Sequence, residues 1–216
     1  MKNHFIVKVS AWALFAFCLF ILNITIASAA TIIDEWGSVK TPPAPQLKPV
    51  SLEPESTALL LLDFNKQVCN NERRPRCIVS IPAVGKLLAE ARKRNVLVVY
   101  SLTIGSSPQD IAPALALRGG EPTVTSGPDK FLGTDLEKIL KARNIRTVIV
   151  TGTAAHGAVI NTASGAAFRG MQVVVPVDGI SAESLFPEQY TVWHLLNAPR
   201  VSGMATMTRT DMITFK

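Results

Sequence analysis

Residues 147–169 have the sequence TVIVTGTAAHGAVINTASGAAFR, a run of β-branched residues followed by glycine and then by small residues. The run 147–150 predicts a buried parallel strand, and Gly152 ends it before a segment that can form a helix. Ligands of open α/β sheets bind at such strand ends, where the free N–H groups of a helix N-terminus can hold an anion or a developing oxyanion. A ligand could reach the main chain here, because little side-chain bulk is present at Gly152, Ala154, Ala155, Gly157 and Ala158. The same composition also fits an ordinary tight turn packed under another helix.

The segments around this stretch alternate between strand and helix patterns. Strands are predicted at 57–62, 96–100, 147–151, 172–177 and 205–208, and helices at 81–94, 135–143, 157–169 and 188–197. Strands separated by helices of this length favour βαβ units, whose strands run parallel. We therefore predict an α/β fold, a three-layer α-β-α sandwich with a doubly wound, mainly parallel sheet of about six strands.

The first 29 residues have the pattern of a secretory signal peptide. Lys2 and Lys8 precede the apolar run 11–26, and the small residues ASAA follow at 27–30. We expect cleavage after Ala29 and a periplasmic or secreted protein without a stable membrane anchor, although a run this long also suits an uncleaved anchor.

A proline-rich segment follows the predicted cleavage site. Residues 30–56 contain five prolines and predict an extended arm on a domain formed by residues 57–216.

The charge pattern argues for a small-molecule partner rather than nucleic acid. Without residues 1–29 the formal net charge of +6 falls by two, and the main basic cluster is Arg73, Arg74 and Arg76. No aromatic residues interleave with this cluster to stack on bases. These arginines could select a carboxylate or could form a solvated basic loop. Trp193, His194 and Leu195 look exposed on the predicted helix 188–197 and suggest an interface with a second copy of the chain.

The cysteines predict a disulfide rather than a metal site. Cys18 lies in the signal peptide, which leaves Cys69 and Cys77 in the sequence CNNERRPRC. An even pair this close in sequence favours a disulfide in an exported protein, and two free thiols are the alternative. The histidines are scattered and the cysteine spacing is not that of a metal site, so we expect no metal or cofactor.

Two charged residues stand out by their placement. Asp63 directly follows the predicted strand 57–62, where catalytic carboxylates of α/β sheets point into the crevice, although aspartate also caps turns and helices. Lys130 lies in GPDKFLGTDL, between a Gly-Pro turn and Phe131. A lysine in this partly apolar setting is either catalytic or extends its charged end to solvent.

With these features the sequence resembles members of the isochorismatase-like hydrolase superfamily, also called the cysteine hydrolases. The resemblance rests on Asp63, Lys130 and the segments VTGTAAHGAVINTA (150–163) and RGMQVVVPVDG (169–179), and it extends from residue 57 to the C-terminus. Isochorismatases, nicotinamidases and N-carbamoyl amide hydrolases belong to this superfamily. The resemblance implies an Asp-Lys-Cys active site, with Asp63 and Lys130 as the first two members.

The resemblance places the family's nucleophilic cysteine at Ala158. It also implies a cis peptide bond between Thr153 and Ala154, with an oxyanion site formed by the main chain from Ala154 to Ala158. A methyl group cannot attack a carbonyl, so the thioester route of the family's amidases is closed. The nicotinamidases' Asp-x-His metal motif is also missing from SLTIGSSPQD (101–110).

Three functional interpretations follow. Isochorismatases cleave a vinyl ether by proton transfer and water attack without an obligatory thiol, so Asp63 and Lys130 could support a hydrolase of this kind. Alternatively, the protein binds a small molecule and has lost the reaction. In the third interpretation Cys69 substitutes for the nucleophile, which a disulfide would prevent.

Overall fold

The computed structural model describes residues 29–216, and the chain divides into two compact units, residues 1–42 and 43–216. The predicted signal peptide, apart from its last residue, lies outside the described residues. Within residues 29–42 there is one short 3-10 helix, Trp36–Ser38. None of the helices in the described part of the chain is both long and apolar enough to cross a membrane.

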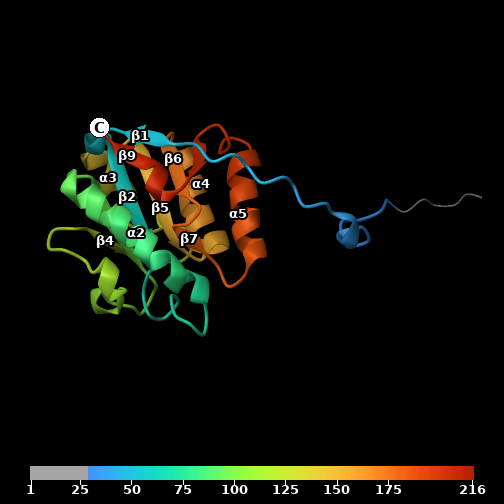
Figure 1. Cartoon of the computed structure of the whole chain (residues 1–216), viewed down its shortest axis with the longest axis horizontal. Coiled ribbons are helices and arrows are strands. Elements are labelled where there is room, and N and C mark those ends of the chain that lie inside the picture. Colours follow the sequence, from blue (N-terminus) through green and yellow to red (C-terminus); the bar gives the residue numbers. More distant parts are fainter. Residues whose placement is uncertain (1–28) are drawn as a thin grey trace, which may run out of the picture. The chain divides into compact units, whose positions relative to one another are not determined.

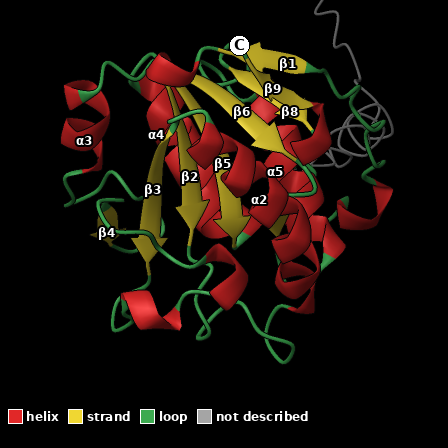
Figure 2. Cartoon of the chain, turned by 60° about the vertical axis from the view of Figure 1, so that its left-hand side comes forward, coloured by secondary structure: helices red, strands yellow, loops and turns green. Residues whose placement is uncertain are grey.

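A seven-stranded parallel sheet forms the centre of the second unit (Figures 1 and 2). Its strand order is β4-β3-β2-β5-β6-β8, and β7 pairs with the end of β5. The strands are β2 (Thr57–Leu62), β3 (Leu97–Leu102), β4 (Thr123–Thr125), β5 (Thr147–Thr153), β6 (Gln172–Pro176), β7 (Ile180–Ser181) and β8 (Ala205–Thr208). The predicted α/β fold is thus confirmed, with seven strands in place of about six.

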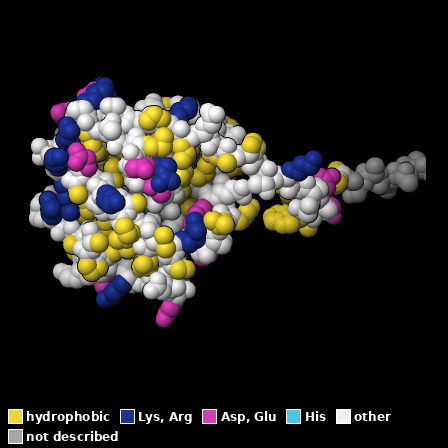
Figure 3. All heavy atoms as spheres, in the orientation of Figure 1, with side chains coloured by type: hydrophobic (Ala, Val, Ile, Leu, Met, Phe, Trp, Pro, Cys, Tyr) yellow, Lys and Arg dark blue, Asp and Glu magenta, His cyan; other side chains and the backbone are white. Residues whose placement is uncertain are grey.

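Helices cover both faces of this sheet. On one face lie α2 (Pro75–Lys93) and a separate two-stranded sheet of β1 (Val50–Leu52) and β9 (Ile213–Phe215). On the other face lie α3 (Leu136–Ala142), α4 (Ile160–Phe168) and α5 (Leu185–Asn197). On the side of the molecule shown in Figure 3, basic side chains lie among acidic and apolar ones.

Strand β2 shows why an unbroken apolar run was needed at the centre of the sheet. All six of its residues are buried. Ala58, Leu60 and Leu62 pack in the core on the α3–α5 side, whereas Leu59 and Leu61 pack in the core on the α2 side. A parallel strand covered on both faces has no solvated side, so its residues do not alternate between apolar and polar.

Several details differ from the sequence-based prediction. Helix α2 begins at Pro75 rather than at residue 81, because proline suits the first helical turn, where its missing N–H leaves no hydrogen bond unmade. Strand β1 lies in the predicted arm, and β1, β4, β7 and β9 were not predicted because each has only two or three residues.

The prediction that Trp193, His194 and Leu195 are exposed on helix α5 was wrong for Leu195. Trp193 is 47% exposed, but Leu195 is fully buried in the core. Two residues apart on an α-helix point in nearly opposite directions, so these side chains cannot share a face.

Candidate active site

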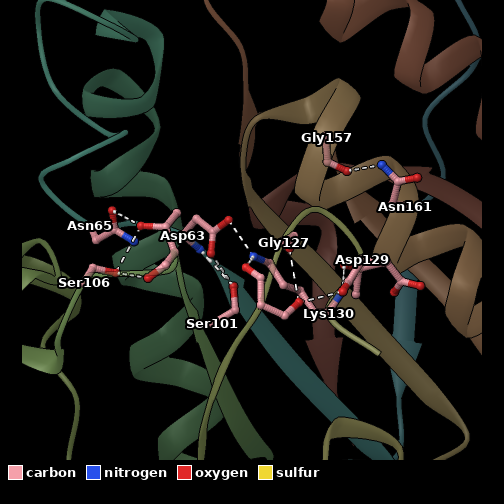
Figure 4. A network of polar contacts seen from close by, with 12 residues as sticks. Asp63, Asn65, Ser101, Ser106, Gly127, Asp129, Lys130, Gly157 and Asn161 are labelled. Carbon is pink, nitrogen blue, oxygen red and sulfur yellow. Dashed lines mark hydrogen bonds and ion pairs between the residues drawn. The ribbon is translucent and has the colours of Figure 1, made fainter. Parts of the chain in front are cut away.

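The candidate site lies where the carboxyl ends of β2, β3 and β5 meet. Leu62, the last residue of β2, pairs with Ser101 in β3 on one side and with Gly152 in β5 on the other. Asp63 is the next residue, so it lies between the ends of β3 and β5. The Asp63 main chain has a positive φ of 56°, and its N–H donates to the carbonyl oxygen of Ser101 at 3.2 Å. Turning the chain here directs the carboxylate across the strand ends, as Figure 4 shows.

Asp63 and Lys130 form a buried ion pair (Figure 4). The Lys130 ammonium donates to Asp63 Oδ2 at 2.8 Å, and the Ser101 hydroxyl donates to Asp63 Oδ1 at 2.7 Å. Only 1% of the Lys130 side chain and 7% of the Asp63 side chain are exposed. The ammonium also donates to the Ser126 carbonyl at 3.2 Å, which leaves one of its three protons without an acceptor among the described residues.

The loop that carries Lys130 is anchored to helix α4. The Lys130 N–H donates to the Thr162 hydroxyl at 3.3 Å, and the Asp129 carboxylate accepts the N–H of Phe131 at 2.9 Å. The Arg169 guanidinium lies over the Phe131 ring, 4.2 Å from its centre. These contacts hold Lys130 toward Asp63 although the two residues are 67 positions apart.

The turn after β5 brings the main chain close to this pair. A Cβ at Gly152 would lie only 2.2 Å from the Leu62 carbonyl oxygen, so no residue with a side chain fits. The peptide bond between Thr153 and Ala154 is cis, as the resemblance implied. A single π-helical turn, Ala155–Val159, then leads into α4. The predicted helix is therefore present, and its irregular first turn is a feature found often at functional sites.

The inner side of this turn is formed by main-chain atoms, because the side chains of its alanines and glycine are small. The Ala154 carbonyl accepts the N–H groups of Gly157 at 3.0 Å and Val159 at 3.2 Å. The Ala154 N–H itself donates to no acceptor in the described part of the chain. Ala158 is 4% exposed, and its methyl group packs in the core on the α4 side. The turn therefore offers a main-chain donor but no nucleophilic side chain.

Cys69 and Cys77 are joined by a disulfide, which confirms the predicted pairing. Both are buried, and the bond closes the loop between the end of β2 and the start of α2. Cys69 is thus not a free thiol. The described residues contain no group of three or more acidic, histidine or cysteine side chains placed to hold a metal ion.

Asn65 is a site residue that the sequence analysis missed. It lies two positions after Asp63, is fully buried, and accepts a hydrogen bond from the Thr103 hydroxyl at 3.4 Å (Figure 4). Its amide nitrogen has no partner in the described structure. Buried polar groups are seldom left without a partner, so this amide is available to a water molecule or ligand. In the sequence it lies in the largely polar stretch DFNKQ (63–67), where one more polar residue gives no signal.

Comparisons with known proteins agree with this geometry. Residues 57–210 match the model of the isochorismatase domain family. A cysteine hydrolase from Pseudomonas syringae is similar in structure, with a TM-score of 0.66 at 19% identity over 78% of this chain and 95% of that chain. An isochorismatase family protein from Burkholderia thailandensis has a TM-score of 0.64 at 22% identity over 77% of this chain and 96% of that one.

An enzyme of named activity has the same fold. The N-carbamoylsarcosine amidase of Thermoplasma acidophilum has a TM-score of 0.61 at 22% identity, over 72% of this chain and 97% of that chain. A search of curated protein sequences found no match. Identities this low establish the fold alone, whereas the family model covers most of the chain. The chain belongs to the isochorismatase family.

Proposed function

We propose that this protein is an exported hydrolase that acts on a small molecule through acid–base or water-mediated chemistry at Asp63 and Lys130. The observation that carries the proposal is the buried Asp63–Lys130 pair at the carboxyl ends of the strands. Each carboxylate oxygen of Asp63 has its own donor, so the side chain is held in one orientation. A carboxyl group held in this way can transfer a proton in a defined direction, which typically contributes about 10²–10⁴-fold in rate.

Water is the attacking group in this proposal, because the methyl group of Ala158 cannot form a covalent intermediate. With a vinyl ether, the Lys130 ammonium passes a proton through Asp63 to the terminal vinyl carbon, and water adds to the carbon that bears the oxygen while the proton it releases returns through Asp63 to Lys130. The resulting hemiketal breaks into a ketone and an alcohol, and its hydroxyl proton leaves with the alcohol. The unused proton of Lys130 and the N–H of Ala154 are available to bind polar atoms of the substrate.

Export is part of the proposal. It is supported by the signal-peptide pattern of residues 1–29 and by the Cys69–Cys77 disulfide, since such bonds persist mainly in oxidising compartments.

A small-molecule binding protein without catalytic activity is the second candidate. Ala158 favours it, because the resemblance assigns this position to the family's nucleophile. The variant Ala158→Cys separates the two candidates. Amidase activity gained by this variant, from a wild type that turns over nothing, would identify a site that lacks only its nucleophile.

The direct test is to assay the mature protein against vinyl ethers, amides and carbamoyl compounds. We expect turnover of at least one compound, and a loss of about 10²–10⁴-fold in kcat in Asp63→Asn, because an amide cannot transfer the proton. Asp135→Asn is the matched control, because Asp135 is exposed and its side chain caps no helix. Wild-type turnover that survives Asp63→Asn unchanged would refute the mechanism.

A further inference from the structure

The loop closed by the Cys69–Cys77 disulfide carries three arginines in different surroundings. Arg76 donates two hydrogen bonds of 2.7 Å to the Glu188 carboxylate, so its charge is matched. Arg73 is exposed to solvent. The Arg74 side chain, by contrast, is only 14% exposed and lacks a close carboxylate partner among the described residues. The basic cluster is therefore not a uniformly solvated surface.

Arg74 has hydrogen-bonding capacity that the protein does not use. Its Nη1 donates to the Val68 carbonyl at 3.3 Å, whereas its Nε is buried and has no hydrogen-bond partner in the described structure. The nearest carboxylate oxygen, of Glu183, lies 3.7 Å from Nε, which is too far for a hydrogen bond. A guanidinium that is largely removed from water and incompletely paired is unfavourable unless a ligand completes its contacts.

Burial and the neighbouring acidic groups act on the Arg74 guanidinium in opposite directions. Burial lowers the pKa of Arg74, the charge of Arg73 lowers it further, and the charges of Glu183 and Asp63 oppose these effects. Arg74 precedes α2, in the segment that follows β2, so it enters from the same edge of the sheet as Asp63.

Glu183 is a loosely held counter-ion of Arg74. Its side chain is 47% exposed, and its second carboxylate oxygen lies 3.5 Å from Nε2 of His156, in the π-helical turn after β5. Neither contact has the 2.7–2.9 Å length of a strong charged hydrogen bond. Glu183 can therefore move away from Arg74 while it remains beside His156.

We propose that Arg74 binds a carboxylate group of the substrate, which displaces Glu183 from it, so that the site selects small carboxylic acids. The inference rests on the proposed function, since it names the substrate class of the same site. An incoming carboxylate can form two parallel hydrogen bonds with the guanidinium, a geometry that the 3.7 Å contact with Glu183 does not reach. The disulfide closes the loop that carries this arginine, so the loop is constrained before the ligand arrives.

Binding of shape-matched probes tests this proposal without any need for turnover. The probes are benzoate with benzamide, and pyruvate with pyruvamide, titrated by calorimetry or ligand-observed NMR. Arg74→Gln should weaken carboxylate binding by roughly 10- to 100-fold, the loss expected for hydrogen bonds to a charged group, and leave the amides unaffected. Glu183→Gln should strengthen carboxylate binding by about two- to fivefold, because it removes a competing weak ion pair.

Two further variants serve as controls. Arg73→Gln removes the same charge from an exposed neighbour and should weaken carboxylate binding far less than Arg74→Gln does. Arg74→Lys keeps the charge and should bind carboxylates with intermediate affinity, because lysine cannot form the paired hydrogen bonds. It provides the test if Arg74→Gln does not fold.

The outcomes separate this proposal from the proposed function. If Arg74→Gln loses carboxylate binding and the wild type turns over no compound, the carboxylate site at Arg74 (the anion site) would be supported although the hydrolase proposal failed. Turnover that needs Asp63 but has the same KM for carboxylate substrates in Arg74→Gln would overturn the anion site alone. Equal losses for amides and carboxylates, or no saturable carboxylate binding, would also overturn it.

Discussion

Replacing Lys130 by methionine should destabilise the protein strongly, because it leaves the Asp63 carboxylate buried without its cation. Only 7% of the Asp63 side chain is exposed, and its remaining side-chain donor is the Ser101 hydroxyl at 2.7 Å. Breaking a buried ion pair by removing one partner typically costs roughly 3–5 kcal/mol. For a domain of this size, that cost corresponds to a decrease in Tm of about 6–20 °C.

The assay is urea unfolding at pH 7 of the wild type, Lys130→Met, Asp63→Asn and the double variant. The double variant should lose less than the sum of the two single variants, by about 0.5–3 kcal/mol, because it leaves no unpaired charge. Lys138→Met is the matched control on an exposed position and should stay within about 0.5 kcal/mol of the wild type. A loss under about 1 kcal/mol in Lys130→Met, or strict additivity, would refute the assignment of a strong buried pair.

Three further predictions concern stability and processing. Replacing both Cys69 and Cys77 by serine should lower the free energy of unfolding by roughly 2–3 kcal/mol, as expected for a short closed loop, and titration of the unfolded, unreduced wild type should find neither of these thiols free. Hydrogen bonds from Lys141 and Arg169 lower the pKa of Glu137 from 4.5 to about 2, so its stabilising effect is complete above pH 4.5 and is lost as the pH falls toward 2. Unfolding free energies of the wild type and Glu137→Gln should therefore converge over that range, and a constant difference would contradict the assignment. N-terminal sequencing of the protein from its native host should begin at Ala30, and a soluble chain that retains Met1 would argue against export.

The fold and the disulfide were predictable because their signals are local. The apolar runs of β2 and β5 are long enough to be identified as buried parallel strands, and Cys69 and Cys77 are close in sequence. Strands β4, β7 and β9 were missed, since two or three residues contain no pattern and form a strand only by pairing with a distant segment.

In the site, Asp63 and the glycine turn could be identified from their places beside predicted strands, and Lys130 from its resemblance to a family residue. The Ser101 contact was not predictable, because it depends on the register between β2 and β3. Asn65 was overlooked because a single polar residue reveals its missing partner only when its burial is known.

Sequence by itself determined the alternation of strands and helices, the placement of Asp63 at a strand end and the absence of a cysteine at position 158. Only the tertiary structure distinguished the three arginines of one short loop, of which Arg76 is paired, Arg73 is solvated and Arg74 is largely buried with an unused donor. The physical reason is that strand and turn preferences act between neighbours in the chain. Whether an arginine is paired, solvated or left without a partner depends instead on its exposure to solvent and on groups distant in sequence. Glu188, for example, lies 112 residues away from Arg76.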